Sequence, residues 1–287
     1  MLFIIGTITV IVCTLGGYAA MGGKLYVLWQ PFEVVIIVGA ALGGFIISSS
    51  KEIMVGTGKA MGGTLMGGTP FKKDDYQELL VMLFSVFKMA RTKGALALEA
   101  HVENPTESDL FKKYPTFYKN KEMRTFLCDY LRLITMGTTN VHQMEELMEQ
   151  EIEAHHEESH QISHAVITMA DSMPALGIVA AVLGVIKTMG SINEPPEVLG
   201  KLIGGALVGT FLGVWISYGF LAPMGRNIGD KYDAESRYMR VMKVAILAYL
   251  QGHAPQVAVE FARKNIFHEF RPSFYEIEDA VSNVSID

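Results

Sequence analysis

The sequence is poor in cysteine and in charged residues. Only two of its 287 residues are cysteine, and because Cys13 lies in an apolar run and Cys128 in a charged region, we expect no disulfide between them. So few cysteines also exclude Cys-rich zinc and iron–sulfur sites. Charged residues make up 19% of the chain and hydrophobic residues 50%. This balance excludes a disordered chain and disfavours a simple soluble globule.

The charge that is present suits neither nucleic acid nor nucleotides. The net charge is −6, and no basic stripe could neutralise phosphates. The sequence contains no P-loop, and the Gly-Thr-Gly stretch at residues 56–58 lacks the spacing of a dinucleotide fingerprint. We therefore expect no nucleic-acid partner, no nucleotide as fuel, and no cofactor.

Two apolar segments near the N-terminus predict a membrane hairpin. Residues 2–20 are almost wholly apolar, and residues 34–50 are free of charge between Glu33 and Lys51. Each is about long enough to cross a bilayer as a helix. A cleaved signal peptide would carry Lys or Arg before its apolar core, and none occurs here. The first hairpin is therefore predicted within residues 1–50, with spans at about 2–20 and 33–50.

A second hairpin is predicted within residues 171–223, with spans at about 172–190 and 202–222. A polar turn containing Pro195 and Pro196 separates these spans, because two prolines stop a helix. Gly205, Gly209 and Gly213 recur at a spacing of four and predict close helix packing. The packing would be either that of ordinary membrane helices or that around a partner or pore.

The basic residues predict the orientation of the hairpins. All but three of the 24 Lys and Arg residues lie in segments 51–170 and 223–287, and the three exceptions lie at or near the short turns: Lys24, Lys187 and Lys201. Because cytoplasmic loops carry excess Lys and Arg, we expect the domain at 51–170, the tail at 224–287 and both termini to be cytoplasmic.

The cytoplasmic segments are predicted to be helical. Apolar residues recur at helical spacing between 79 and 87, a further helix is expected at 126–134, and a long acidic helix from 141 to about 169. Residues 51–73, which include Gly67 and Gly68, read as an interfacial segment. Strand-like alternation is scarce. The predicted class is an all-α polytopic membrane protein with four transmembrane helices and a helical cytoplasmic domain.

The acidic helix contains an H-E-x-x-H pattern formed by His156, Glu157 and His160. Two histidines four residues apart on a helix can chelate zinc, with the glutamate as base of a protease. The pattern fixes only three positions in a stretch crowded with Glu and His, and no third ligand motif accompanies it. A solvated helical face is the simpler interpretation, so we expect no metal site.

Several stretches carry a family resemblance that covers nearly the whole chain. Residues 170–184 (ADSMPALGIVAAVLG) resemble the third span of flagellar motor stator subunits of the MotA family, and residues 208–213 (VGTFLG) with Tyr218 and Pro223 resemble the fourth. The remaining matches are shorter and lie in the cytoplasmic segments: residues 98–99 (LE), 103–105 (ENP), 130–133 (YLRL), 259–264 (VEFARK) and 271–274 (RPSF).

The resemblance implies a motor subunit of the bacterial inner membrane and not an enzyme. Five such subunits would surround the membrane helices of a MotB-type partner, which has a single transmembrane helix, and proton flow would produce torque on the rotor. The essential proton-carrying aspartate would belong to the partner. We expect this chain to contribute no ion carrier, because its second and fourth spans read as free of carboxylates.

The resemblance assigns two prolines as hinges that couple ion movement to the cytoplasmic domain: Pro174 and Pro223. The residues alone also allow a plainer reading. Pro174 would then lie in the first turn of the third span, capped by Asp171 or Ser172, and Pro223 would close the fourth span. Asp171 lies at the cytoplasmic mouth, where helix capping is its expected role.

The resemblance places Thr210 toward the partner helices, near the ion path. A hydroxyl bonded back to its own helix is the alternative. Sodium-driven relatives carry a second threonine where this chain has Ala181, and losing a hydroxyl ligand favours protons over sodium. Tyr218 would face either the path or the lipid near the interface.

The resemblance also implies contact with the rotor switch protein FliG through Arg91 and Glu99, with Lys93 as a neighbour that shares the role. Glu151 matches a further charged position of the family. Without the resemblance, these residues read as solvated charges. Charged rim contacts tune association and specificity, which suits a stator that engages and leaves.

Four other readings remain open from sequence. A sodium-driven stator of the same family is one, and an ExbB/TolQ-type energiser of outer-membrane transport is another, although such relatives have three spans. A zinc-dependent membrane protease and a passive scaffold complete the set.

Overall fold

The computed structural model describes residues 2–65, 71–138 and 140–284, and this part of the chain is helical, without strands. Gly67 and Gly68 of the predicted interfacial segment lie outside the described residues. The chain divides into two compact units. The first comprises Met1–Thr69 and Glu158–Lys231, and the second Pro70–Glu157 and Tyr232–Asp287. The all-α class is confirmed.

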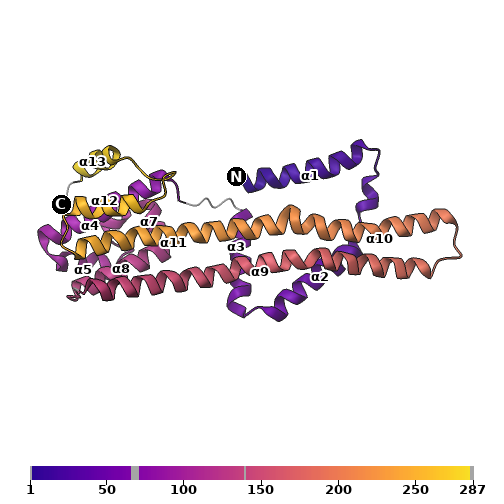
Figure 1. Cartoon of the computed structure of the whole chain (residues 1–287), viewed down its shortest axis with the longest axis horizontal. Coiled ribbons are helices and arrows are strands. Elements are labelled where there is room, and N and C mark those ends of the chain that lie inside the picture. The colour runs from indigo at the N-terminus through magenta and orange to yellow at the C-terminus, as the bar shows by residue number, and fades with distance from the viewer. Residues whose placement is uncertain (1, 66–70, 139, 285–287) are drawn as a thin grey trace. The chain divides into compact units, whose positions relative to one another are not determined.

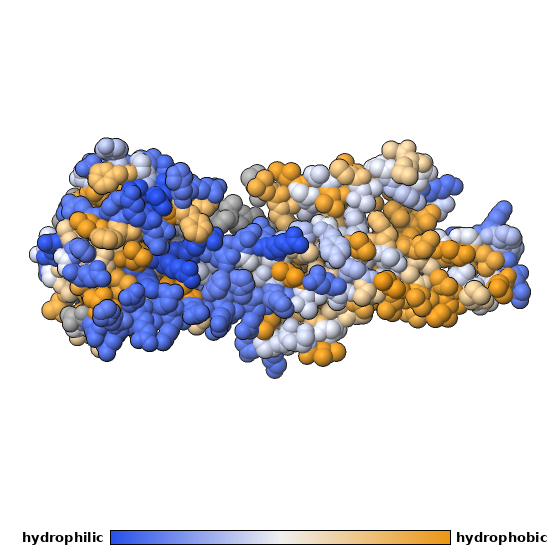
Figure 2. Space-filling view, viewed as in Figure 1, coloured by the Kyte–Doolittle hydropathy of each residue, from blue (hydrophilic) through white to orange (hydrophobic). Residues whose placement is uncertain are grey.

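The first unit contains α1 (Leu2–Ala20), the 3₁₀ turn η1 (Leu25–Leu28), α2 (Pro31–Ser48) and α3 (Lys51–Leu65). The C-terminal part of α9 (Val141–Met189), α10 (Pro196–Ile216), the π-helical turn η3 (Ser217–Leu221) and the start of α11 (Ala222–Leu250) complete it. Four helical stretches are long and apolar enough to cross a membrane, as predicted: Leu2–Ala20, Leu25–Ser48, Val141–Met189 and Pro196–Leu250. Figure 2 shows apolar surface over much of this unit.

The helix α9 is continuous where we expected two helices. It runs from Val141 to Met189 with Pro174 in its interior (Figure 1). The prediction that Asp171 or Ser172 caps the start of the third span is therefore wrong, because no helix begins there. The Ser172 hydroxyl donates instead to the Met169 carbonyl at 2.7 Å. A proline removes one backbone donor, and apolar packing on both sides of it keeps the helix intact.

The helix of the fourth span also continues past the predicted end of that span. The helix α10 passes through the π-helical turn Ser217–Leu221 directly into α11, and Pro223 lies in the first turn of α11. The helix therefore does not end at Pro223, and the role of Pro223 at the end of the membrane span stays a prediction. In a regular α-helix the ring of Pro223 would crowd the carbonyl of the residue four positions earlier. The wider π-helical turn lies at this point, and such turns are one way for a helix to accommodate this crowding.

The second unit packs a core between α4 (Lys73–Lys93), α8 (Lys121–Thr135), the N-terminal part of α9, the C-terminal part of α11, and α12 (Pro255–Asn265). Shorter elements complete it: η2 (Ala95–Leu98), α5 (Glu99–Glu103), α6 (Asp109–Lys112), α7 (Pro115–Lys119) and α13 (Phe274–Ser282). The predicted periodic helix is confirmed, since Leu79, Leu83 and Phe87 of α4 are all buried. The helix α4 ends at Lys93, and the φ of +87° at the following Gly94 favours glycine.

Candidate functional site

The helices α9 and α10 meet through bare backbone. A Cβ added to Gly213 would lie 2.6 Å from the Met173 carbonyl oxygen, and one added to Gly177 would lie 2.8 Å from the Gly209 carbonyl oxygen. Both distances are too short for any side chain. The close packing predicted from the glycine spacing is confirmed at Gly209 and Gly213, whereas Gly205 contacts only the flexible end of the Gln30 side chain.

The two predicted hinge prolines flank this contact. Pro174 is half-buried and follows Met173, the residue whose carbonyl meets Gly213. Pro223 is also half-buried. Two residues after it, the Gly225 carbonyl accepts a hydrogen bond from the Ser163 hydroxyl of α9 at 2.8 Å. Each proline therefore lies next to a point where α9 and the α10–α11 helix are in direct contact.

Two of the predicted ion-path residues lie on the same contact. If Gly209 carried a Cβ, that atom would lie 3.3 Å from the Ala181 amide nitrogen. A Cβ on Gly177 would likewise lie 3.3 Å from the Thr210 Cα. The Thr210 hydroxyl forms no hydrogen bond within the described part of the chain, so the alternative of a bond back to its own helix is not found. Thr188 does make such a bond, to the Gly184 carbonyl at 2.9 Å.

The other two predicted ion-path residues lie on the surface of this single chain. Tyr218 is 60% exposed, within the π-helical turn. Asp171 is exposed on α9, three residues before Pro174. Neither is brought into the glycine contact.

One carboxylate within the membrane segments was missed from sequence. The helix α2 begins at Pro31, and Glu33 lies in its first turn, inside the span Leu25–Ser48. The expectation that the second span has no carboxylate is therefore wrong. The expectation failed because it places the Glu33 charge at the edge of the second span. Pro31 was the available signal, because proline favours the first helical position.

The predicted rotor-facing charges gather at one end of α4. Arg91 and Lys93 lie in its last turn and Glu99 opens α5, and all three are exposed. Neither Arg91 nor Glu99 forms an ion pair with any residue that the structure describes. Arg91 also lines a groove between α4, α12 and α13, whose other lining residues are Phe84, Lys88, Thr92, Ala254, Pro255, Gln256, Glu278, Val281 and Ser282.

Glu151 differs from these charges in having an internal partner. The Tyr130 hydroxyl donates to Glu151 Oε2 at 2.5 Å, and Tyr130 is 2% exposed. Burial raises the pKa of the Tyr130 hydroxyl, and the neighbouring Glu151 carboxylate raises it further. The Glu151 carboxylate is therefore held by the core of the second unit.

The histidine-rich stretch of α9 contacts carboxylates on other helices. His155 Nε2 lies 3.2 Å from Glu122 Oε2, and His156 Nδ1 lies 3.5 Å from Asp233 Oδ1. Two groups of three side chains bring one ligand atom per residue to within 4.8 Å of one another, a spacing that could hold a metal ion: Glu122, His155 and Glu235, and His156, His160 and Asp233. Asp233 is thus a third candidate ligand beside the two histidines of the pattern, which the sequence did not reveal. Glu157, the base of the H-E-x-x-H pattern, is exposed and belongs to neither group.

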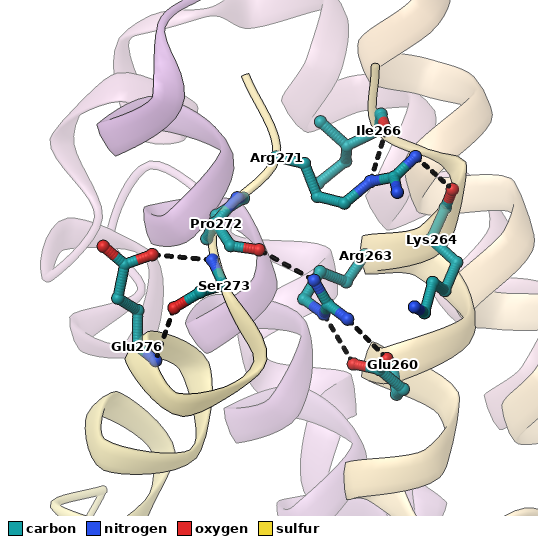
Figure 3. A network of polar contacts seen from close by, with 8 residues as sticks. All are labelled: Glu260, Arg263, Lys264, Ile266, Arg271, Pro272, Ser273 and Glu276. Carbon is teal, nitrogen blue, oxygen red and sulfur yellow. Dashed lines mark hydrogen bonds and ion pairs between the residues drawn. The ribbon is translucent and has the colours of Figure 1, made fainter. Parts of the chain in front are cut away.

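The two tail motifs join in a polar network (Figure 3). The Arg263 guanidinium, 6% exposed, donates to both carboxylate oxygens of Glu260 at 2.6 Å and to the Pro272 carbonyl at 2.8 Å. The Arg271 side chain donates to the Ile266 and Lys264 carbonyls at 2.8 and 3.1 Å. These contacts hold the chain after α12 against that helix. The family-like residues of the tail therefore have a role in folding as well as any role at the surface.

Comparison with known proteins matches both halves of the chain. Residues 4–94 match the family model described as Motility protein A N-terminal, and residues 118–241 match the MotA/TolQ/ExbB proton channel family. The chain is 41% identical to Motility protein A of Escherichia coli over 99% of its length and 96% of the relative's. The Salmonella typhimurium protein is 40% identical over the same shares of the two chains. The chain belongs to the Motility protein A family.

The fold agrees with this membership. The solved structure described as C. jejuni MotAB aligns with a TM-score of 0.77, covering 93% of this chain and 96% of that chain at 20% identity. The family is one of ion channels and not of enzymes, so the zinc-protease reading is set aside. The N-terminal match and the four spans separate the chain from ExbB/TolQ-type energisers.

Proposed function

We propose that this chain is the membrane subunit of a flagellar motor stator, converting ion flow into torque on the rotor. The observation that carries this proposal is the α9–α10 backbone contact with Pro174 beside it, in a chain that belongs to the Motility protein A family. Helices in direct backbone contact transmit a shift without slack, because no side chain lies between them to change rotamer.

A MotB-type partner with one transmembrane helix would complete the channel. The third span leaves apolar side chains exposed on this single chain, among them Ile178, Val182 and Ile186, so its surface can take both protein and lipid. Five copies around the partner helices are the arrangement we expect, in the inner membrane with both termini cytoplasmic. The distribution of Lys and Arg supports that orientation.

Protons are the proposed ion. The Ala181 amide nitrogen lies against Gly209, and the Ala181 side chain offers no oxygen, so among the described residues of this contact Thr210 carries the hydroxyl. A sodium ion needs several oxygen ligands, whereas a proton needs one acceptor at a time. A sodium-driven stator of the same family is the alternative.

The rotor contact is proposed at the exposed end of α4, through Arg91 and Glu99 with Lys93 beside them, facing the switch protein FliG. The absence of ion pairs to Arg91 and Glu99 within the described residues leaves both charges available to a partner. Glu151 has a smaller part in this proposal, because its carboxylate already accepts the Tyr130 hydrogen bond.

The test is the swimming speed of a strain that lacks its own stator and carries this chain with its cognate partner. We expect a speed that is independent of external sodium at fixed pH and is lost on adding a proton uncoupler. A speed that follows sodium would keep the stator and overturn the choice of ion. No motility with a correctly inserted complex would favour a passive scaffold.

A further inference from the structure

The carboxyl of Glu33 reaches the contact between α9 and α10 at Gly184 and Gly209. Glu33 Oε2 lies 2.7 Å from the position that a Cβ on Gly209 would occupy, and Oε1 lies 3.6 Å from that of a Cβ on Gly184. The carboxyl therefore fills the space that two glycines leave open, one on each helix. An alanine at position 209 would displace it.

This carboxyl is not held as a structural acceptor. Glu33 Oε2 is buried and accepts no hydrogen bond from the residues that the structure describes. A buried carboxylate oxygen without a donor is costly, and more so among apolar helices. A carboxyl placed to brace helices would be expected to accept donors, as Glu276 does in α13.

The charges around Glu33 can compensate its ionised form. Lys187 of α9 acts electrostatically on the carboxyl. The helix α10 has no titratable side chain between residues 205 and 213, and α2 has none besides Glu33. Lys187 therefore supplies a compensating charge to a carboxyl that lacks a hydrogen-bond donor among the described residues.

Glu33 lies next to residues of the proposed ion path. The same Cβ position on Gly209 that meets Glu33 Oε2 lies 3.3 Å from the Ala181 amide nitrogen, and Gly209 directly precedes Thr210. Glu33 thus lies at the level of Ala181 and Thr210 along the glycine contact. Ionisable residues inside membrane segments are rare and mark ion pathways and proton relays.

We propose that Glu33 is a proton-exchanging residue of this subunit, which takes up a proton from water near the short turn before α2 and releases it to the ion path beside Ala181 and Thr210. This inference rests on the proposed stator function. The step moves one proton from water to the Glu33 carboxylate and then to the next acceptor, and no other reactant is needed.

The first test compares Glu33→Gln with Glu33→Asp in the stator-less strain carrying the cognate partner. Gln keeps the size of the side chain and removes the exchangeable proton, so we expect rotation speed to fall at least about tenfold. Asp keeps the carboxyl and should retain speed that varies with external pH. Glu197→Gln, which removes an exposed acid of α10, is the matched control and should change nothing.

Unchanged speed and an unchanged pH profile in a fully assembled Glu33→Gln complex would overturn the proposal. If instead the unmodified chain gives no rotation, the proposed stator function fails, and that result is distinct. Should Glu33→Gln fail to assemble, the unmodified complex supplies the second measurement.

That measurement uses dicyclohexylcarbodiimide, which adds to protonated carboxyl groups in apolar surroundings and leaves a stable adduct on the peptide. We expect mass spectrometry to find the adduct on Glu33, in an amount that falls as the pH rises from about 5 to about 9, because only the acid form reacts. Absence of label from Glu33 at every pH would overturn the proposal.

Discussion

Tyr130 of α8 and Glu151 of α9 are joined by a 2.5 Å hydrogen bond between the phenol and the carboxylate. The two residues are 21 positions apart, and the bond ties the two helices together at the edge of the second unit's core. Changing Glu151 would leave the buried phenol without an acceptor, and changing Tyr130 would take a donor from the carboxylate, so the bond contributes to stability beyond the packing of the ring.

Tyr130→Phe should lower the stability of the second unit. Bonds to charged acceptors contribute roughly 1.5–3 kcal/mol, so the thermal unfolding midpoint of the purified protein in detergent should fall by a few degrees. Tyr275→Phe, at a residue 77% exposed, is the control and should leave the midpoint unchanged. A Tyr130→Phe variant as stable as the unmodified protein would show that the bond is energetically neutral.

Gly213→Ala should disrupt the α9–α10 contact. The added methyl would lie 2.6 Å from the Met173 carbonyl, and backbone cannot move aside as a flexible side chain can. Overpacking of this kind costs about 1–3 kcal/mol. Gly204→Ala lies on the same helix with nothing within 4 Å of the added carbon. Equal yields and equal thermal stability of the two variants in membranes would contradict the contact.

Pro174→Ala should separate assembly from torque. Alanine restores the backbone donor inside α9 and strengthens the helix, so the protein should insert and bind its partner normally. We expect rotation to be lost, because the weakened point in the helix is gone. Rotation speed and co-purification with the partner check the two parts of the prediction, and normal swimming would remove the hinge role.

Arg91→Glu should weaken engagement with the rotor without affecting folding. Arg91 is exposed and forms no ion pair within the described residues, so charge reversal leaves the core of α4 intact. We expect fewer stators bound per motor, and a dependence on ionic strength that is typical of rim charges. Lys113→Glu, at another exposed cation of the same unit, is the control. Full engagement would place the interface elsewhere.

Acid should loosen α13 through Glu276. The bond from Lys73 and the bond from the Ser273 amide lower the pKa of this carboxyl from 4.5 to about 2. A carboxyl with a lowered folded pKa stabilises above its unfolded pKa, so this contribution is full above about 4.5 and lost as the pH falls toward 2. Glu276→Gln should flatten the change of unfolding midpoint with pH across that window. Glu278→Gln on the same helix should retain it.

The sequence predicts the buried and closely packed faces of single helices better than it predicts where the long helices begin and end. The spacing of Leu79, Leu83 and Phe87 was enough to predict a buried helix face, and the spacing of Gly209 and Gly213 was enough to predict close packing. Both signals are periodic, and each depends only on residues within one helix.

The missed features depend on residues outside the local window. Asp171, Ser172 and Pro174 form a convincing start signal, yet α9 runs through them, because tertiary packing outweighs a local preference of a few kcal/mol. The hydrogen bond between Tyr130 and Glu151 joins two helices, so no periodic pattern within either helix could predict it. From sequence, Glu33 is placed at the edge of the predicted span 33–50 and not in its interior, because a charge beside an apolar run is typical of a boundary.

The π-helical turn at Ser217–Leu221 makes this stretch unusually tolerant of a change in length. A π turn holds one more residue than an α turn, so deleting a single residue there would convert it to regular helix and keep α10 and α11 in their present rotational register. A deletion between Gly213 and Ser217 that the turn did not absorb would rotate one side of the helix by about 100°. Genetic screens for functional single-codon deletions should therefore recover them inside this turn and not in the glycine-lined part of α10.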